Sequence, residues 1–251
     1  MTWEGTPHHT TGTGGPVRLA LTGEFQLTVD GRWLTVPHSV ERVLAYLALA
    51  ERPVSRTKLA SALWLVSSEQ QAANNLRTTL WRVGRADARL LSADSDRLRL
   101  SPTVRVDLVE LSGFAQRLIH DPQADDLSRL PLLIEHAELL PDWDDEWVVA
   151  DRERFRLLRL EALERAASAL IARGRLGEAL VAALASVQSE PLRESASRLV
   201  VQVHVAEGNL AEALRWYREY RTLLGRELGI EPSRLMRQLV EPLLRPGVTM
   251  Q

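Results

Sequence analysis

The stretch that decides the fold is SEQQAANNLRTTLWRVGRADARLL, residues 68–91. Ser68 followed three residues later by Gln71 has capping-box spacing, which predicts a helix that begins at Glu69. At about 100° per residue, one side of this helix is apolar. The residues on that side are Leu76, Leu80 and Val83.

The opposite side of this helix is polar and has no acidic residue between Gln70 and Ala86. Amide, hydroxyl and guanidinium groups on one stripe are suited to base edges and phosphates. We therefore expect a DNA-recognition helix, and the alternative is a polar face that is merely solvated. The outward stripe consists of Gln71, Asn74, Thr78, Trp81 and Arg85, flanked by Arg77 and Arg82.

Two further helices are expected before this one, at residues 39–50 and 55–64. Ser55 is a typical helix N-cap, and Pro53 keeps the two helices apart. A linker at residues 65–67 then leads to the polar-faced helix. This order is that of a helix-turn-helix, with a loop in place of the tight turn.

The segments on either side of the three helices alternate as strands do. Within residues 17–36 the apolar residues have a period of two, and Asp30-Gly31 predicts a type I′ hairpin turn, so we expect a small antiparallel meander. After the helices, residues 94–96 can turn the chain. Arg97 and Arg99 then alternate with leucines, which predicts a hairpin over residues 97–105 that acts as a wing. An ordinary hairpin with a solvated face is the alternative, and the position directly after the polar-faced helix favours the wing.

The charge of the chain is unevenly distributed. The 251 residues carry a net charge of −2, but residues 52–105 hold 10 basic and 4 acidic side chains, which is typical of a segment that binds a polyanion. Lys58 is the only lysine, so the abundance of arginine reflects codon bias. It does not by itself indicate nucleic-acid binding. The chain lacks cysteine, an apolar run of about 20 residues and a signal-peptide pattern, so we expect a cytoplasmic, nucleoid-associated protein without membrane contact. Residues 1–16 have no periodicity and are expected to be disordered.

From residue 108 onward every segment has helical periodicity, and two stretches repeat. ARGRLGEAL at 172–180 matches AEGNLAEAL at 206–214 in six of nine positions, at an offset of 34 residues. This is the period of the tetratricopeptide repeat, a helix pair that stacks on its neighbour. The helices expected here are 110–120, 126–139, 153–173, 176–189, 194–207, 210–228 and 232–244.

Nothing in the chain has the spacing of a catalytic motif, so we expect neither an enzyme nor a cofactor. The acidic run at residues 142–146 has no histidine beside it. Trp143 and Trp147 could form an aromatic ligand site, but packing against Phe155 or the first repeat is the favoured interpretation.

Several longer stretches carry a family resemblance: SRTKLASALW at 55–64, AANNLRTTLWR at 72–82, RLRLSPTVRVDL at 97–108, EPLRESA at 190–196 and RELGIEPS at 226–233. With the order of parts, they resemble the Streptomyces antibiotic regulatory protein (SARP) family of transcriptional activators, over about residues 17–245. The resemblance implies a mainly α fold with a small β component. Residues 17–107 would form an OmpR-type winged helix-turn-helix, and residues 108–251 a bacterial transcriptional activator domain of tetratricopeptide-like helices.

The resemblance also implies a function. The chain would bind tandem repeats in double-stranded promoter DNA near the −35 region, with a second copy beside it, and would recruit RNA polymerase holoenzyme through its sigma factor to antibiotic and other secondary-metabolite genes. The alternatives are a repressor, a protein-interaction scaffold built on the tetratricopeptide-like helices, or a regulator gated by a small molecule. The expected DNA contacts are Arg56, Lys58, Gln71, Asn74, Asn75, Arg77, Thr78, Trp81, Arg82, Arg85, Arg97 and Arg99.

Overall fold

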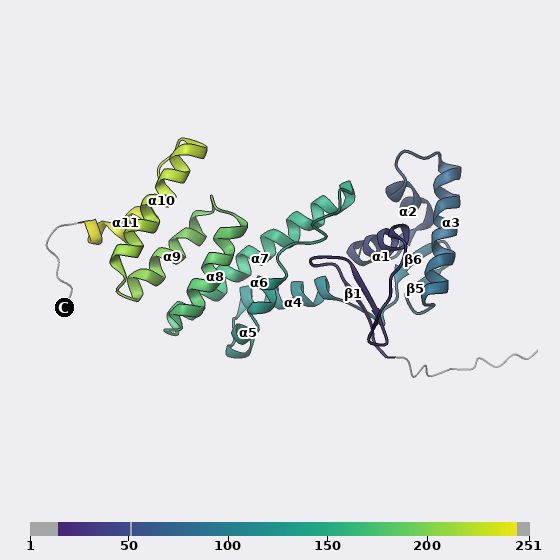
Figure 1. Ribbon diagram of the computed structural model, residues 1–251, viewed down its shortest axis with the longest axis horizontal. Coiled ribbons are helices and arrows are strands. Elements are labelled where there is room, and N and C mark those ends of the chain that lie inside the picture. Colours follow the sequence, from purple (N-terminus) through teal and green to yellow (C-terminus); the bar gives the residue numbers. More distant parts are fainter. Residues whose placement is uncertain (1–14, 51, 245–251) are drawn as a thin grey trace, which may run out of the picture. The chain divides into compact units, whose positions relative to one another are not determined.

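The computed structural model describes residues 15–50 and 52–244, and the chain divides into two compact units between Asp107 and Leu108 (Figure 1). The predicted disordered tail at residues 1–16 lies almost wholly outside the described residues. As predicted, the fold is mainly α-helical with a small β component, and strands occur only in the first unit among the residues that are described.

Three helices form the core of the first unit: α1 (His38–Ala50), α2 (Arg56–Leu63) and α3 (Glu69–Ala86). Ser55 caps α2 by accepting a hydrogen bond from the backbone N–H of Lys58. The capping box predicted at the start of α3 is confirmed. The Ser68 side chain accepts from the backbone N–H of Gln71, and the Gln71 side chain accepts from the backbone N–H of Ser68. Leucine and valine side chains of the three helices are buried against one another: Val43, Leu44, Leu47, Leu59, Leu63, Leu76 and Val83.

One sheet has the order β3-β2-β1-β7, made of β1 (Val17–Ala20), β2 (Gln26–Val29), β3 (Arg32–Trp33) and β7 (Val104–Val106). The predicted meander is confirmed, because β1 to β3 pair antiparallel. The turn between β2 and β3 has positive φ at both Asp30 (51°) and Gly31 (77°), as a type I′ turn requires. The fourth strand, β7, pairs parallel to β1 and was not predicted.

A second sheet has the order β4-β6-β5, made of β4 (Val54–Ser55), β6 (Arg97–Leu100) and β5 (Leu91–Asp94). The predicted turn at residues 94–96 is confirmed, but the hairpin bounds 97–105 are wrong. The hairpin is β5–β6, which turns at Ser95 and Asp96, and residues 104–106 join the other sheet as β7. Alternation along a strand indicates its buried face but not its partner, and here Val104 and Val106 are buried on the N-terminal sheet. Three helices and a terminal hairpin make the first unit a winged helix-turn-helix.

The second unit consists of helices, and no helix in the described part of the chain is long and apolar enough to cross a membrane. They are α4 (Asp107–His120), α5 (Ala124–Ser128), α6 (Pro131–Glu135), α7 (Glu146–Ala172), α8 (Leu176–Ser189), α9 (Glu194–Ala206), α10 (Leu210–Leu228) and α11 (Arg234–Leu244). The single helix predicted at 126–139 is wrong, because α5 ends at Ser128 and a new helix starts at Pro131, which has no N–H to continue the hydrogen bonding of α5. The predicted start of α7 at residue 153 is also wrong, by seven residues.

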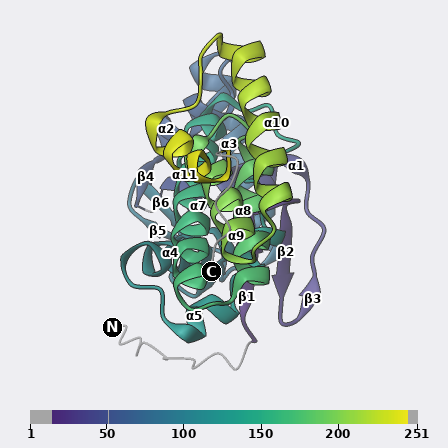
Figure 2. The same ribbon diagram turned by 90° about the vertical axis from the view of Figure 1, so that its left-hand side faces the viewer.

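The predicted 34-residue repeat appears in the backbone as two matching helix pairs, α7–α8 and α9–α10. Arg175 donates its N–H to the carbonyl of Leu170 at 3.0 Å, and Asn209 makes the equivalent bond to His204 at 2.8 Å. The turn glycines, Gly174 and Gly208, have φ of +71° and +77°. Neighbouring helices from α7 to α10 pack against each other, and Figure 2 shows α7, α8 and α9 side by side. The pairs therefore stack as tetratricopeptide repeats do.

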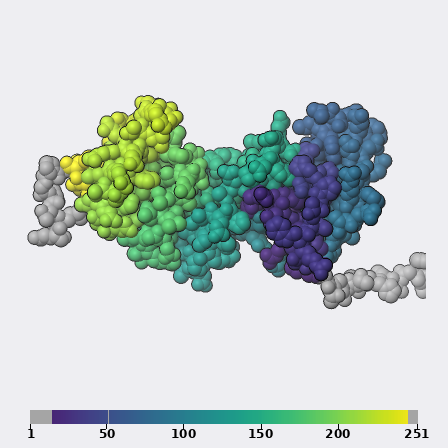
Figure 3. All heavy atoms as spheres, in the orientation of Figure 1, coloured from purple at the N-terminus to yellow at the C-terminus, as the bar shows by residue number. Residues whose placement is uncertain are grey.

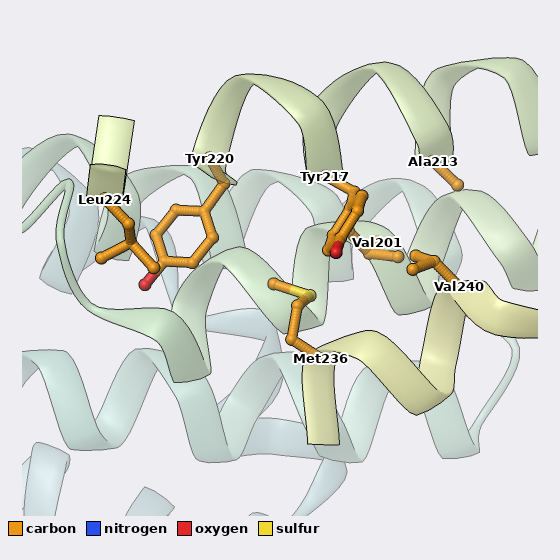
Figure 4. Close-up of a cluster of buried hydrophobic side chains, with 7 residues drawn as sticks. All are labelled: Val201, Ala213, Tyr217, Tyr220, Leu224, Met236 and Val240. Carbon is orange, nitrogen blue, oxygen red and sulfur yellow. The ribbon is translucent and has the colours of Figure 1, made fainter. Parts of the chain in front are cut away.

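The last helix closes the stack over a cluster contributed by α9, α10 and α11 (Figure 4). The buried side chains are Val201, Ala213, Tyr217, Tyr220, Leu224, Met236 and Val240. Tyr220 donates its hydroxyl to the carbonyl of Leu192, and burial raises the pKa of this phenol to about 12. The cluster covers the apolar end of the second repeat.

The tryptophans before α7 belong to a tightly held turn. The rings of Trp143 and Trp147 meet edge to face, with centroids 6.1 Å apart. Arg152 donates hydrogen bonds to the carbonyls of Leu139, Leu140 and Trp143, which ties this turn to α7. The ring contact and the bound turn support packing as the role of the two tryptophans.

Candidate nucleic-acid interface

The recognition helix predicted from the sequence is α3, and its two faces differ sharply. Ala72, Leu76, Thr79 and Val83 are buried, whereas the predicted outward stripe is exposed. Leu80 was predicted on the inner face, but it is only half-buried and Thr79 is buried there instead. In Figure 3 the blue atoms around α3 form an outer surface of the first unit.

Two polar groups of the outward stripe are partly used inside the helix. The Oε1 atom of Gln71 accepts from the backbone N–H of Ser68 at 3.3 Å, so only its amino group remains free to face a ligand. The hydroxyl of Thr78 donates to the carbonyl of Asn74 at 3.1 Å. The amide and guanidinium side chains of the stripe and its flanks that are exposed and hydrogen-bonded to no other described residue are Asn74, Arg77, Arg82 and Arg85, together with Asn75 beside the stripe.

Trp81 lies on the exposed face rather than at a junction between helices. Its side chain is 61% exposed, and the guanidinium of Arg85 lies over its ring at 5.1 Å from the centroid. A cation above the face of an aromatic ring is attracted to it, and this attraction restrains both side chains. The pair presents a flat apolar surface next to a positive charge.

The start of α2 is held beside the wing. The backbone N–H of Arg56 donates to the carbonyl of Asp96 at 3.0 Å, and Ser55 is paired with Arg97 in the β4–β6 ladder. Arg56 also lines a groove of about 370 Å³ between α2 and α3, whose other wall includes Arg77. The structure thus brings together three predicted contact residues from three different elements.

The wing presents its arginines outward, as predicted. In β6, Leu98 is buried on the core side, while Arg97 and Arg99 are exposed on the other side. Arg97 is opposite Asp94 in the ladder, yet the two form no ion pair. Both guanidinium groups are therefore available to a phosphate.

The two units use their basic residues in different ways. In the second unit most arginines contact carboxylates or carbonyls of their own unit, as Arg156 does with Glu153 and Glu190. In the first unit most basic side chains contact no carboxylate of the described residues, namely Arg18, Arg32, Arg52, Arg56, Lys58, Arg77, Arg82, Arg85, Arg97, Arg99 and Arg105. Cations without internal partners leave the first unit with a field that attracts polyanions.

The group that fixes the end of α3 was not predicted from the sequence. Arg89 donates to both carboxylate oxygens of Asp87, the C-cap of α3, and to both oxygens of Asp30 in the β2–β3 turn. The hydrogen bonds from Arg89 hold the pKa of both carboxyls below the ordinary value. Asp30 and Arg89 are 59 residues apart, so no local pattern could have identified the contact.

No cluster of potential metal ligands occurs among the residues that the structure describes. The surface of α3, the start of α2 and the β5–β6 wing offers amides, guanidinium groups and one flat ring. Such a surface is suited to reading a double helix: the amides and Arg77 toward base edges, and the flanking cations toward phosphates.

Comparison with known proteins gives concordant matches. Residues 123–244 match the bacterial transcriptional activator domain. The chain is 28% identical to "Regulatory protein AfsR" of Streptomyces coelicolor over 92% of its own length, which is 24% of that protein. It is 27% identical to "Transcriptional regulatory protein EmbR" of Mycobacterium tuberculosis, covering 90% of this chain and 63% of that one. The chain therefore spans about a quarter to two thirds of the length of these relatives.

The fold itself is similar to a solved structure, that of Mycobacterium tuberculosis EmbR in complex with a low-affinity phosphopeptide. The TM-score is 0.70 at 26% sequence identity, and the match covers 93% of this chain and 66% of the EmbR chain. AfsR is thus named as a regulatory protein and EmbR as a transcriptional regulatory protein.

Proposed function

Because this chain carries a bacterial transcriptional activator domain at residues 123–244 and is similar to SARP-type transcriptional regulators along its length, we propose that it is a sequence-specific DNA-binding activator. It would bind tandem repeats in promoter DNA and recruit RNA polymerase to secondary-metabolite genes. The observation that carries the proposal is the outer face of α3, which has no acidic residue after Glu69 and is flanked by unpaired cations of α2 and the wing.

In this proposal α3 enters the major groove, where an α-helix fits and where base edges are distinguishable. Asn74, Arg77 and Arg82 would face the bases, with Gln71, Asn75 and Thr78 beside them. The phosphate contacts would come from Arg56, Lys58, Arg85, Arg97 and Arg99. Trp81 would lie against a sugar or a thymine methyl group.

DNA binding is tested by selecting sites from a random duplex library and then measuring fluorescence anisotropy on the selected site and on a scrambled copy. We expect specific sites to bind at least about 10³-fold more tightly than scrambled DNA at physiological salt. Equal affinity for both DNAs at every salt concentration would refute sequence-specific binding and leave the scaffold alternative.

Activation requires a surface for polymerase near the DNA, and the loop between α2 and α3 offers one. Leu65 is 68% exposed and Val66 fully exposed, side by side. We expect the double substitution Leu65→Ser/Val66→Ser to abolish stimulation in an in vitro transcription assay while leaving DNA affinity unchanged. Leu228→Ser, an exposed leucine of the second unit, is the matched control. A wild-type chain that binds DNA without stimulating transcription would be a repressor instead.

A further inference from the structure

One row of side chains crosses all four strands on the outer face of the N-terminal sheet. The ladder aligns Arg105 of β7 with Arg18 of β1, Arg18 with Thr28 of β2, and Thr28 with Trp33 of β3. The opposite face of the same strands is buried, with Val17, Leu19, Leu27, Val104 and Val106 in the core. We call the row Arg105–Arg18–Thr28–Trp33 the sheet row; Thr28 is half-buried and the other three side chains are exposed.

The sheet row has the composition of a contact surface rather than of a solvated face. Trp33 is 74% exposed, although burial of its ring would stabilise the fold. Arg18 and Arg105 are exposed neighbours on adjacent strands, about 4.8 Å apart, and like charges in this position repel. Neither arginine contacts a carboxylate among the described residues. No ion pair of the described residues 15–50 and 52–107 therefore offsets this repulsion.

The chemistry of the sheet row defines its ligand. Guanidinium groups bind carboxylates with paired hydrogen bonds, and the exposed Trp33, two strands away from Arg18 in the same row, can accept an apolar side chain. The proposed DNA contacts come from α2, α3 and the β5–β6 wing, none of which belongs to this sheet. The row therefore fits an acidic protein segment that also carries apolar residues.

The chain itself contains such a segment, PDWDDEWVV at residues 141–149. Asp142, Asp144 and Glu146 are exposed and form no hydrogen bond or ion pair with other described residues. Val149 follows them and is 57% exposed. We call residues 141–149 the acidic segment.

We propose that the sheet row of one copy of this chain binds the acidic segment of a second copy. The two surfaces are different, so the contact is heterologous and joins copies head to tail. Copies joined head to tail all point in the same direction. Binding sites repeated in tandem on DNA would orient the copies in the same way. The arrangement of copies on DNA rests on the proposed function, whereas the contact between two copies does not.

Cross-linking in the absence of DNA tests the contact directly, because the chain has no native cysteine. A Thr28→Cys copy is mixed with a Val149→Cys copy and treated with a short bismaleimide. We expect a mixed dimer that is lost when Arg18→Glu/Arg105→Glu is added to the first copy. The control mixes Thr28→Cys with Gln238→Cys, an exposed position of α11. Its yield measures cross-linking by random collisions. A yield no higher than this background would overturn the proposal whether or not the chain binds DNA.

Anisotropy on DNA with one site and with two adjacent sites tests the consequence. We expect the wild type to bind the second site about 5- to 150-fold more tightly than the first, the usual range for coupled sites. At about 0.15 M ionic strength, exposed charges farther than about 8 Å from the DNA are largely screened. Under these conditions Arg18→Glu/Arg105→Glu should abolish this coupling with one-site affinity unchanged, and adding Asp142→Arg/Asp144→Arg to the same chain should restore it. Arg218→Glu/Arg234→Glu makes the same charge change on exposed positions of the second unit and should keep the coupling.

Each contrary result has a separate meaning. A fall in one-site affinity caused by Arg18→Glu/Arg105→Glu would show that the sheet row contacts DNA, and coupling that survives these substitutions would show that the row is not needed. Either result would overturn the proposal. A wild type that does not prefer its selected site over scrambled DNA would refute the proposed function instead, and the cross-linking experiment would still decide the contact.

Discussion

At the scale of single residues, the interface combines side chains with different tasks. Arg77 projects from the middle of α3, the helix proposed to enter the groove, whereas Arg97 lies on the wing. A base contact distinguishes sequences and a phosphate contact does not. The two arginines should therefore respond differently to truncation, although the side chains are chemically identical.

We expect Arg77→Ala to cost about 1–3 kcal/mol on the selected site and to relax base preference at one position, while Arg97→Ala weakens selected and scrambled DNA alike. Fluorescence anisotropy of both variants on both DNAs measures this. Equal losses on both DNAs for both variants would contradict the assignment of roles.

Replacing Trp81 tests whether this residue contacts DNA or stabilises the fold. Because the ring is 61% exposed and touches Arg85, Trp81→Ala should change the free energy of unfolding by no more than about 1 kcal/mol. The same substitution should weaken binding to the selected site. Urea denaturation and anisotropy measure the two effects, and a variant that is strongly destabilised but binds DNA normally would assign Trp81 to the fold.

At the scale of elements, α3 is held at both ends. The capping box with Ser68 fixes its start, and Asp87 and Arg89 fix its end to the β2–β3 turn. A recognition helix contributes specificity only if its orientation is fixed to within a fraction of an ångström. Loss of either anchor should therefore affect DNA recognition as well as stability.

Arg89→Met should lower the midpoint of urea unfolding at pH 7. The pKa of Asp87 is lowered in the folded state, so the stabilisation is fully present above the ordinary value of 3.8 and is lost as the pH falls through the lower folded value. The difference between Arg89→Met and wild type should thus vanish in strong acid. A difference that is independent of pH would contradict the role of this ion pair.

The turns of the repeat require glycine. Gly174→Ala leaves the new methyl group in open space, so its cost of about 1–2 kcal/mol would come from the positive φ alone. Gly113→Ala is the matched control, because Gly113 lies within α4 and alanine should stabilise a helix there by about 0.5–1 kcal/mol. Circular dichroism during urea denaturation measures both, and equal effects of the two substitutions would contradict the argument.

At the scale of the whole molecule, the distribution of free cations decides how binding responds to salt. The basic side chains of the first unit are mostly unpaired, whereas those of the second mostly contact their own unit. Affinity for DNA should fall steeply with salt, because each phosphate contact releases counterions. The first unit should determine this dependence.

We expect Lys58→Ala to reduce the slope of log affinity against log salt concentration by about 1. Arg218→Ala, which removes an exposed unpaired arginine of the second unit, should leave the slope unchanged. Anisotropy titrations at several salt concentrations measure both slopes. The same loss of slope for both variants would place DNA contacts on the second unit as well.

The sequence by itself determined the features that depend on local order. The cap at Ser68, the turn at Asp30 and Gly31, and the repeat around Gly174 and Gly208 are confirmed, because capping, positive φ and helical periodicity involve residues close in the chain. The exposed stripe of α3 followed from the same periodicity.

Only the tertiary structure decided which distant segments meet. The pairing of β7 with β1, which removes residues 104–106 from the wing, and the bond from Arg89 to Asp30 join residues 59 or more positions apart. The sheet row exists only because of that pairing, since it places Arg105 beside Arg18. Alternation along a strand indicates which face is buried. The backbone hydrogen-bonding groups of the strand are the same for every possible partner. The partner therefore depends on how the whole unit packs.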